Sequence, residues 1–122
     1  MFSNAKYGFD SQEINYMLDF IKEVGNRVIQ DAREVNPKDD YQSGMKEQLI
    51  SVTQQAVVND NKNTVSPQSC YAIARRAMKY KGELSFGEGG NTLLSSDKMG
   101  YYQSKIDELK TKFPSFDYME PR

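Results

Sequence analysis

Apolar residues recur at alternating steps of four and three in four separate segments of the chain. In the longest segment the repeat contains Ile14, Leu18, Ile21, Gly25, Val28, Ala32 and Val35. This spacing places the side chains on one stripe of an α-helix, whereas a half-buried strand would alternate at every second residue. The pattern therefore predicts an all-α fold, a three- to four-helix bundle in which the apolar stripes face a shared core.

The first helix is predicted to run from Asp10 to Val35. Asp10 followed by Glu13 fits a capping box, which satisfies two free backbone donors at the start of a helix. Pro37 ends the helix, because proline disfavours helical geometry at the residue before it. Gly25 lies in the middle and costs about 1 kcal/mol relative to alanine, so we expect another helix to approach closely there.

Three shorter helices are predicted over residues 43–59, 66–82 and 95–113. The third opens with a serine cap followed by proline at the first helical position, where the missing N–H costs nothing. It is expected to end at Gly82, which can adopt the left-handed cap conformation. The fourth is stopped by a proline. All four helices fit one domain, residues 1–122.

Two segments lack the helical repeat. The residues on either side of the Gly-rich turn GEGGN predict a short β-hairpin near residues 83–94, since Gly and Asn are frequent in hairpin turns. The tail, residues 113–122, carries aromatic side chains and a methionine without periodicity. We expect this tail to pack on the domain or dock on a partner, with a loose tail as the alternative.

Four glycines within residues 82–90 raise the question of a phosphate-binding loop. A Walker sequence requires Lys and then Ser or Thr after the last glycine, but Asn91 follows Gly90. A Rossmann fingerprint requires a third glycine where Thr92 stands. The loop is therefore predicted to be a connector, and a small anionic ligand bound there stays a weaker alternative.

Residues 67–82 form the most basic segment of the chain. They carry a local charge of +4 without any acidic residue, although the whole chain has a formal net charge of −1. A helix with this charge and with tyrosines nearby could contact the phosphates of a nucleic acid. It could equally meet the acidic first helix or an acidic protein. The candidate contact residues are Arg75, Arg76, Lys79 and Lys81.

The sequence offers little for catalysis. It contains no histidine, the commonest general base and metal ligand. Cys70 lies on the apolar face of the third helix, where burial would leave the thiol inert. The segment NDNKNT lacks the glycine and glutamate of a calcium-binding EF-hand loop. We therefore predict no catalytic, cofactor-binding or metal-binding residue and no enzymatic activity.

Composition limits the cellular compartments in which the protein is expected. Cys70 is the only cysteine, so an intramolecular disulfide is impossible and a reducing compartment is expected. The N-terminal sequence does not resemble a secretory signal, and no apolar run reaches the length of a membrane helix. We expect a cytoplasmic protein without membrane contact. Leu, Ile, Val and Phe form only about a fifth of the chain, near the lower limit for a stable core.

These features together predict a non-catalytic interaction protein. The first helix would be about 37 Å long, so shorter neighbours would leave part of its stripe exposed, and exposed apolar patches usually mark a partner. A second copy of the chain is the simplest partner. We expect an adaptor, inhibitor or assembly component that binds stoichiometrically and forms a homo-oligomer. A nucleic-acid-binding regulator that uses the basic helix around residues 75–81 is the alternative.

Overall fold

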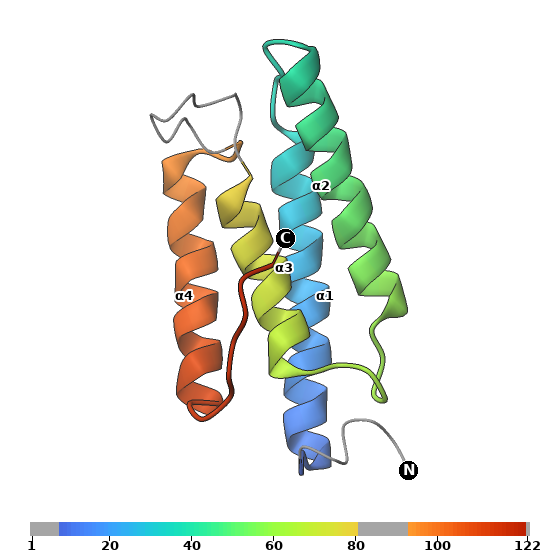
Figure 1. Ribbon diagram of the computed structural model, residues 1–122, viewed down its shortest axis with the longest axis vertical. Helices are drawn as coiled ribbons and strands as arrows, with labels where there is room; N and C mark the ends of the chain where they lie inside the picture. The colour runs from blue at the N-terminus through green and yellow to red at the C-terminus, as the bar shows by residue number, and fades with distance from the viewer. Residues whose placement is uncertain (1–7, 81–92, 122) are drawn as a thin grey trace.

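The computed structural model describes residues 8–80 and 93–121. It contains four helices, α1 (Ser11–Arg33), α2 (Asp40–Asn59), α3 (Pro67–Lys79) and α4 (Ser96–Lys112), and no strand within those ranges (Figure 1). The prediction of an all-α fold is therefore confirmed. The predicted hairpin near residues 83–94 falls almost wholly outside the described residues. The described residues on either side of positions 81–92 are joined by one hydrogen bond, from the Leu93 N–H to the Tyr80 carbonyl over 2.7 Å.

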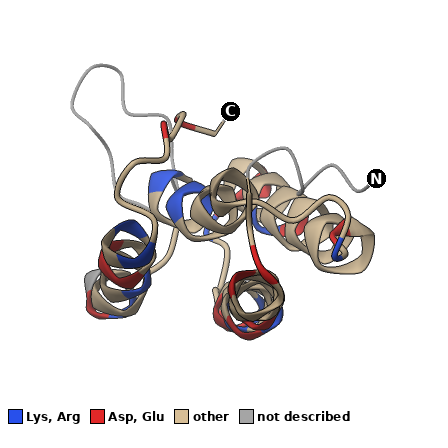
Figure 2. Ribbon diagram, turned by 90° about the horizontal axis from the view of Figure 1, so that it is seen from below, with Lys and Arg blue, Asp and Glu red and all other residues tan. Residues whose placement is uncertain are grey.

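The helices are arranged around the pair formed by α1 and α3. α2 packs mainly on α1, and α4 packs mainly on α3. In the end-on view, α2 and α4 lie on opposite sides of this central pair (Figure 2). Each central helix therefore buries side chains on two sides, whereas each outer helix keeps one broad face open.

The starts of the helices follow local capping chemistry. The Asp10 carboxylate accepts from the Glu13 N–H (2.8 Å), and the Glu13 carboxylate accepts from the Asp10 N–H (3.0 Å), as the sequence predicts. The predicted start of the second helix at residue 43 is wrong by three residues. Asp39 caps α2, because its carboxylate accepts from the Gln42 N–H over 2.8 Å.

The third helix begins where predicted but ends early. Ser66 and Ser69 form a capping box around Pro67 at the first turn. The predicted end of this helix at Gly82 is wrong, because α3 stops at Lys79 and Tyr80 is already extended (φ −68°, ψ 130°). No left-handed residue is needed at that point, since Tyr80 can adopt this conformation without strain.

The expected exposed stripe on the first helix is not present. The middle of α1 is buried, mainly at Met17, Phe20, Ile21, Val24, Val28 and Ala32. Towards the ends of the stripe, Ile14, Leu18 and Val35 are half-buried, and none of its residues is fully exposed. Because α2 begins three residues earlier than predicted, it covers more of α1. At the other end Phe113 closes the stripe, with its ring 5.4 Å from that of Phe9 and 6.1 Å from that of Tyr16.

Gly25 allows α1 and α2 to approach closely, as predicted. A Cβ atom at this position would lie only 2.4 Å from Cγ2 of Val57 and 3.8 Å from Cγ2 of Thr53. The first distance is far below ordinary carbon–carbon contact, about 3.5–4.0 Å. The glycine thus has a packing role that offsets its low helix propensity.

Candidate functional site

Two of the predicted anion-binding residues hold an internal carboxylate. The Arg75 Nε lies 2.9 Å from Glu120 Oε1, and the Lys79 Nζ lies 3.4 Å from the same oxygen. Arg76 is half-buried and makes no ion pair with any residue that the structure describes. Lys81 lies outside the described residues. Arg75 and Lys79 therefore meet Glu120 near the C-terminus, and not the acidic first helix, which was one of the alternatives from the sequence.

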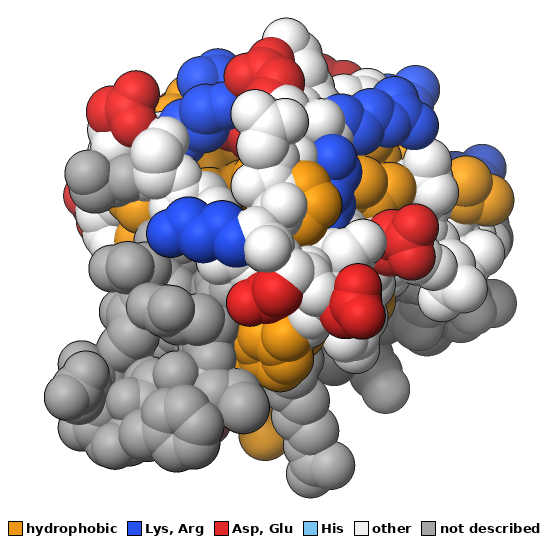
Figure 3. All heavy atoms as spheres, turned by 90° about the horizontal axis from the view of Figure 1, so that it is seen from above, with side chains coloured by type: hydrophobic (Ala, Val, Ile, Leu, Met, Phe, Trp, Pro, Cys, Tyr) orange, Lys and Arg blue, Asp and Glu red, His pale blue; other side chains and the backbone are white. Residues whose placement is uncertain are grey.

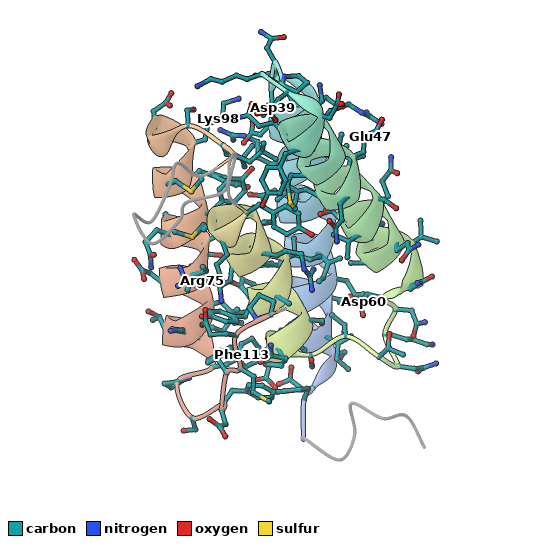
Figure 4. The ribbon with its side chains drawn as sticks, turned by 45° about the horizontal axis from the view of Figure 1, so that its top comes forward. Asp39, Glu47, Asp60, Arg75, Lys98 and Phe113 are labelled. Carbon is teal, nitrogen blue, oxygen red and sulfur yellow. The ribbon has the colours of Figure 1, made fainter. Side chains whose placement is uncertain are left out.

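Residues 114–121 form a strap that runs from the end of α4 back along α3 (Figures 1 and 2). The Gln68 carboxamide donates to the Met119 carbonyl and accepts from the Met119 N–H, both over 2.7 Å. The Tyr71 hydroxyl donates to the Glu120 carboxylate. Figure 4 shows Arg75 and Phe113 on the side of the bundle where this C-terminal strap lies.

The strap is held by electrostatics as well as by ring contacts. Hydrogen bonds from Tyr71 and then Arg75 lower the pKa of Glu120 to about 2. Burial, and then the bond to Glu120, raise the pKa of Tyr71. The centre of the Tyr118 ring lies 5.3 Å from that of the Tyr71 ring. The Tyr118 hydroxyl donates a hydrogen bond to the Phe113 carbonyl over 2.9 Å. Near neutral pH the Glu120 carboxylate is therefore charged, and it is paired with Arg75 and Lys79.

A buried carboxylate, Asp31, links α1 to α4. It is only 4% exposed and accepts from the Tyr102 hydroxyl over 2.6 Å. The Arg27 Nε and the Lys98 Nζ lie 3.3 and 3.4 Å away. Burial, and then the bond to Asp31, raise the pKa of Tyr102. A buried charge requires such partners, so this cluster fixes how α4 meets α1.

Asp31 was not among the residues predicted from the sequence to form a site, although one signal points to it. Asp31 follows Val24 by seven residues and Val28 by three, which places a carboxylate on the buried side of its helix. A charge at a core position indicates a partner on another element. The partner is 71 residues away in sequence, so no local pattern identifies it.

A cavity of about 370 Å³ opens beside this cluster, between the end of α1, the start of α2 and the start of α4. Its walls include two carboxylates, Asp31 and Glu34, and two amines, Lys38 and Lys98. Lys98 already bridges the carboxylates, with its Nζ 2.8 Å from Glu34. Seen from above, Figure 3 shows cationic and anionic side chains interspersed over this end, without a field of one sign.

The second half of α2 is free of charge. From Gln48 to Asn59 no residue of α2 is charged, and Val58 is 79% exposed. A groove of about 460 Å³ follows this part of α2 where it meets α1. We define the α1–α2 face as the groove residues and their exposed neighbours on α2, namely Asn26, Ile29, Arg33, Ser51, Gln54, Gln55, Val57, Val58 and Asn59.

The candidate nucleophile is sealed in the core. Cys70 is 0% exposed, and its thiol lies 3.6 Å from the Met17 carbonyl. Burial raises the pKa of Cys70 well above that of a free thiol, so little thiolate forms near neutral pH. Within the described ranges, no three His, Cys, Asp or Glu side chains are grouped so that they could hold a metal ion.

The chain was compared with known protein families, curated proteins and solved structures. No family model matches the chain, and no curated protein or solved structure matches it either. Among the helices of residues 8–80 and 93–121, none is both long and apolar enough to cross a membrane.

Proposed function

We propose that this chain acts without catalysis, by stoichiometric binding of a protein partner through the α1–α2 face. A second copy of the chain is the simplest partner, so the protein works as a homo-oligomeric adaptor, inhibitor or assembly component in the cytoplasm. Affinity comes from the apolar side chains of this face, and the charged residues around it set the orientation of the partner.

The observation that carries this proposal is the stretch of α2 from Gln48 to Asn59, which has no charged residue although charged residues form 27% of the chain. The other twelve-residue stretch without charge, residues 63–74, is buried or half-buried except at Thr64, whereas half of residues 48–59 are exposed. The cores of protein interfaces are depleted in Lys, Glu and Asp in the same way. Arg33 is the only charged residue of the α1–α2 face, so a symmetric contact between two copies has only this one pair of like charges to keep apart.

The test is the mass of the wild-type chain and of Val58→Lys, measured by light scattering after size exclusion over a range of concentrations. The wild type should exceed the single-chain mass of 14.0 kDa, and Val58→Lys should return to it, because a charge would be buried at the interface. The matched control is Ser104→Lys, which adds the same charge at an exposed position of α4 and should leave association unchanged. A wild type that stays at 14.0 kDa at millimolar concentration would exclude a second copy as the partner.

A nucleic acid on the basic side of α3 is the second candidate. It is supported by the carboxylate that Tyr71, Arg75 and Lys79 already hold, because phosphate oxygens accept from the same donors. Here Glu120→Gln should raise the affinity for a short DNA duplex, and that affinity should fall steeply with salt. Equal binding by wild type and variant, flat from low to moderate salt, would exclude this candidate.

A further inference from the structure

The strap lies along one row of side chains on α3. Gln68, Tyr71, Arg75 and Lys79 follow each other at steps of three and four, so they share one side of the helix. Each of the four contacts the strap. We define the strap groove as these four residues together with Lys110 of α4, whose Nζ lies 5.3 Å from the centre of the Tyr71 ring.

This groove recognises an extended segment in two ways. Gln68 bonds both backbone groups of Met119, which requires an extended chain but no particular side chain, and the Met119 side chain is 69% exposed. Tyr71, Arg75 and Lys79 then bind the carboxylate of the next residue. One aromatic contact, between Tyr118 and Tyr71, lies two residues before that carboxylate.

All of these groove contacts come from residues 118–120 of the strap, and none requires that the strap belong to the same copy. The exposed residues Pro114 and Ser115 connect the strap to the end of α4. The Glu120 side chain is 51% exposed, whereas Phe116 and Tyr118 are half-buried against the core, so a strap that leaves its own groove gains by entering an equivalent one. A second copy carries the same segment and would reproduce every contact.

We propose that the strap groove also accepts the strap of a second copy, so that two chains exchange residues 114–121. The exchange is separate from association through the α1–α2 face and does not depend on it. A tethered segment has a local concentration in the millimolar range. Each chain therefore fills its own groove when dilute, and exchange occurs where copies are concentrated, as in an assembly.

Charge reversal in two different chains tests the exchange directly. One chain carries Glu120→Lys, and the other carries Arg75→Glu with Lys79→Glu. Within either chain, like charges oppose each other and push the strap from its own groove. Between the two chains, each strap meets a groove of opposite charge. Both chains also carry Val58→Lys, which removes association through the α1–α2 face.

Each chain alone should have the single-chain mass of 14.0 kDa by light scattering, and the equimolar mixture should have about twice that mass. A chain that carries all three reversals has matched charges internally and should remain at 14.0 kDa. Circular dichroism should show the same helix content in every variant. A mixture that stays at the single-chain mass while both chains keep their helix content would overturn the proposal.

A second variant separates strap exchange from general attraction between opposite charges. Gln68→Ala in the chain with the acidic groove removes the two hydrogen bonds to the strap backbone and leaves all charges in place. This change should raise the dissociation constant of the mixed dimer about tenfold. An unchanged affinity would mean that the charges attract without the strap entering the groove, and would also overturn the proposal.

Discussion

Replacing Gly25 by alanine tests the close packing of α1 on α2. The new Cβ would lie 2.4 Å from Cγ2 of Val57, at least about 1 Å inside ordinary contact. Alanine improves helix propensity by about 1 kcal/mol, but overpacking typically costs about 1–3 kcal/mol. Since valine is stiff at χ1, the helices must separate, and we expect a net loss of about 1 kcal/mol in the free energy of unfolding.

Whether Gly25→Ala lowers or raises the free energy of unfolding should depend on the Val57 side chain. In a Val57→Ala background the obstructing methyl group is absent, so Gly25→Ala should stabilise the chain by about 0.5–1 kcal/mol through helix propensity alone. Urea unfolding of the four chains in this double-mutant cycle gives both values. The matched control is Gly100→Ala in α4, where a Cβ meets nothing within 4 Å and stabilisation is expected. If Gly25→Ala stabilised the wild type, or had the same effect in both backgrounds, the argument would be refuted.

Three further changes test the polar contacts and the core. Tyr102→Phe removes a hydrogen-bond donor to the buried Asp31 carboxylate and should lower the free energy of unfolding in urea by about 1–3 kcal/mol. The control Tyr101→Phe, whose carboxylate partner is exposed, should lower it by only about 0.5 kcal/mol. Equal losses for the two variants would contradict the role of Asp31. The pKa of Glu120 is lowered from 4.5 to about 2. The stability that the Glu120 carboxylate gives to the docked strap is therefore complete above pH 4.5 and is lost as the pH falls towards 2. Glu120→Gln should remove this part of the acid-induced change in tyrosine NMR signals, and an identical acid response would refute the pairing. A thiol reagent should modify Cys70 only as fast as the chain unfolds globally, so rapid labelling of the folded chain would show that the core is open.

The sequence predicts the parts of this fold that local chemistry decides. The apolar repeat identifies four helices, the residue pair at Asp10 identifies a capping box, and Gly25 identifies a close helix contact. Each of these signals lies within one or two helical turns, so no knowledge of the tertiary structure is needed. The start of α2 has a local signal too, because Asp39 is a strong N-cap residue, but the apolar repeat begins only at Met45 and places the predicted start too late.

The candidate sites could be predicted only in part, because their partners are distant in sequence. Arg75 and Lys79 were identified from charge, but the carboxylate that they bind is 45 residues from Arg75. An exposed apolar stripe was expected on the first helix, whereas the most exposed large apolar side chain in the described residues is Val58 on α2. Helix length alone could not show how the neighbouring helices and Phe113 would cover α1.

The most direct test of the proposed function is a concentration series of amide NMR spectra of the full chain. If copies associate through the α1–α2 face, the shifts that change with concentration should cluster at residues 26–33 and 51–59. Val58→Lys should remove these changes. Spectra that do not change with concentration, or changes confined to α3 and α4, would contradict the assignment of this face as the interaction surface.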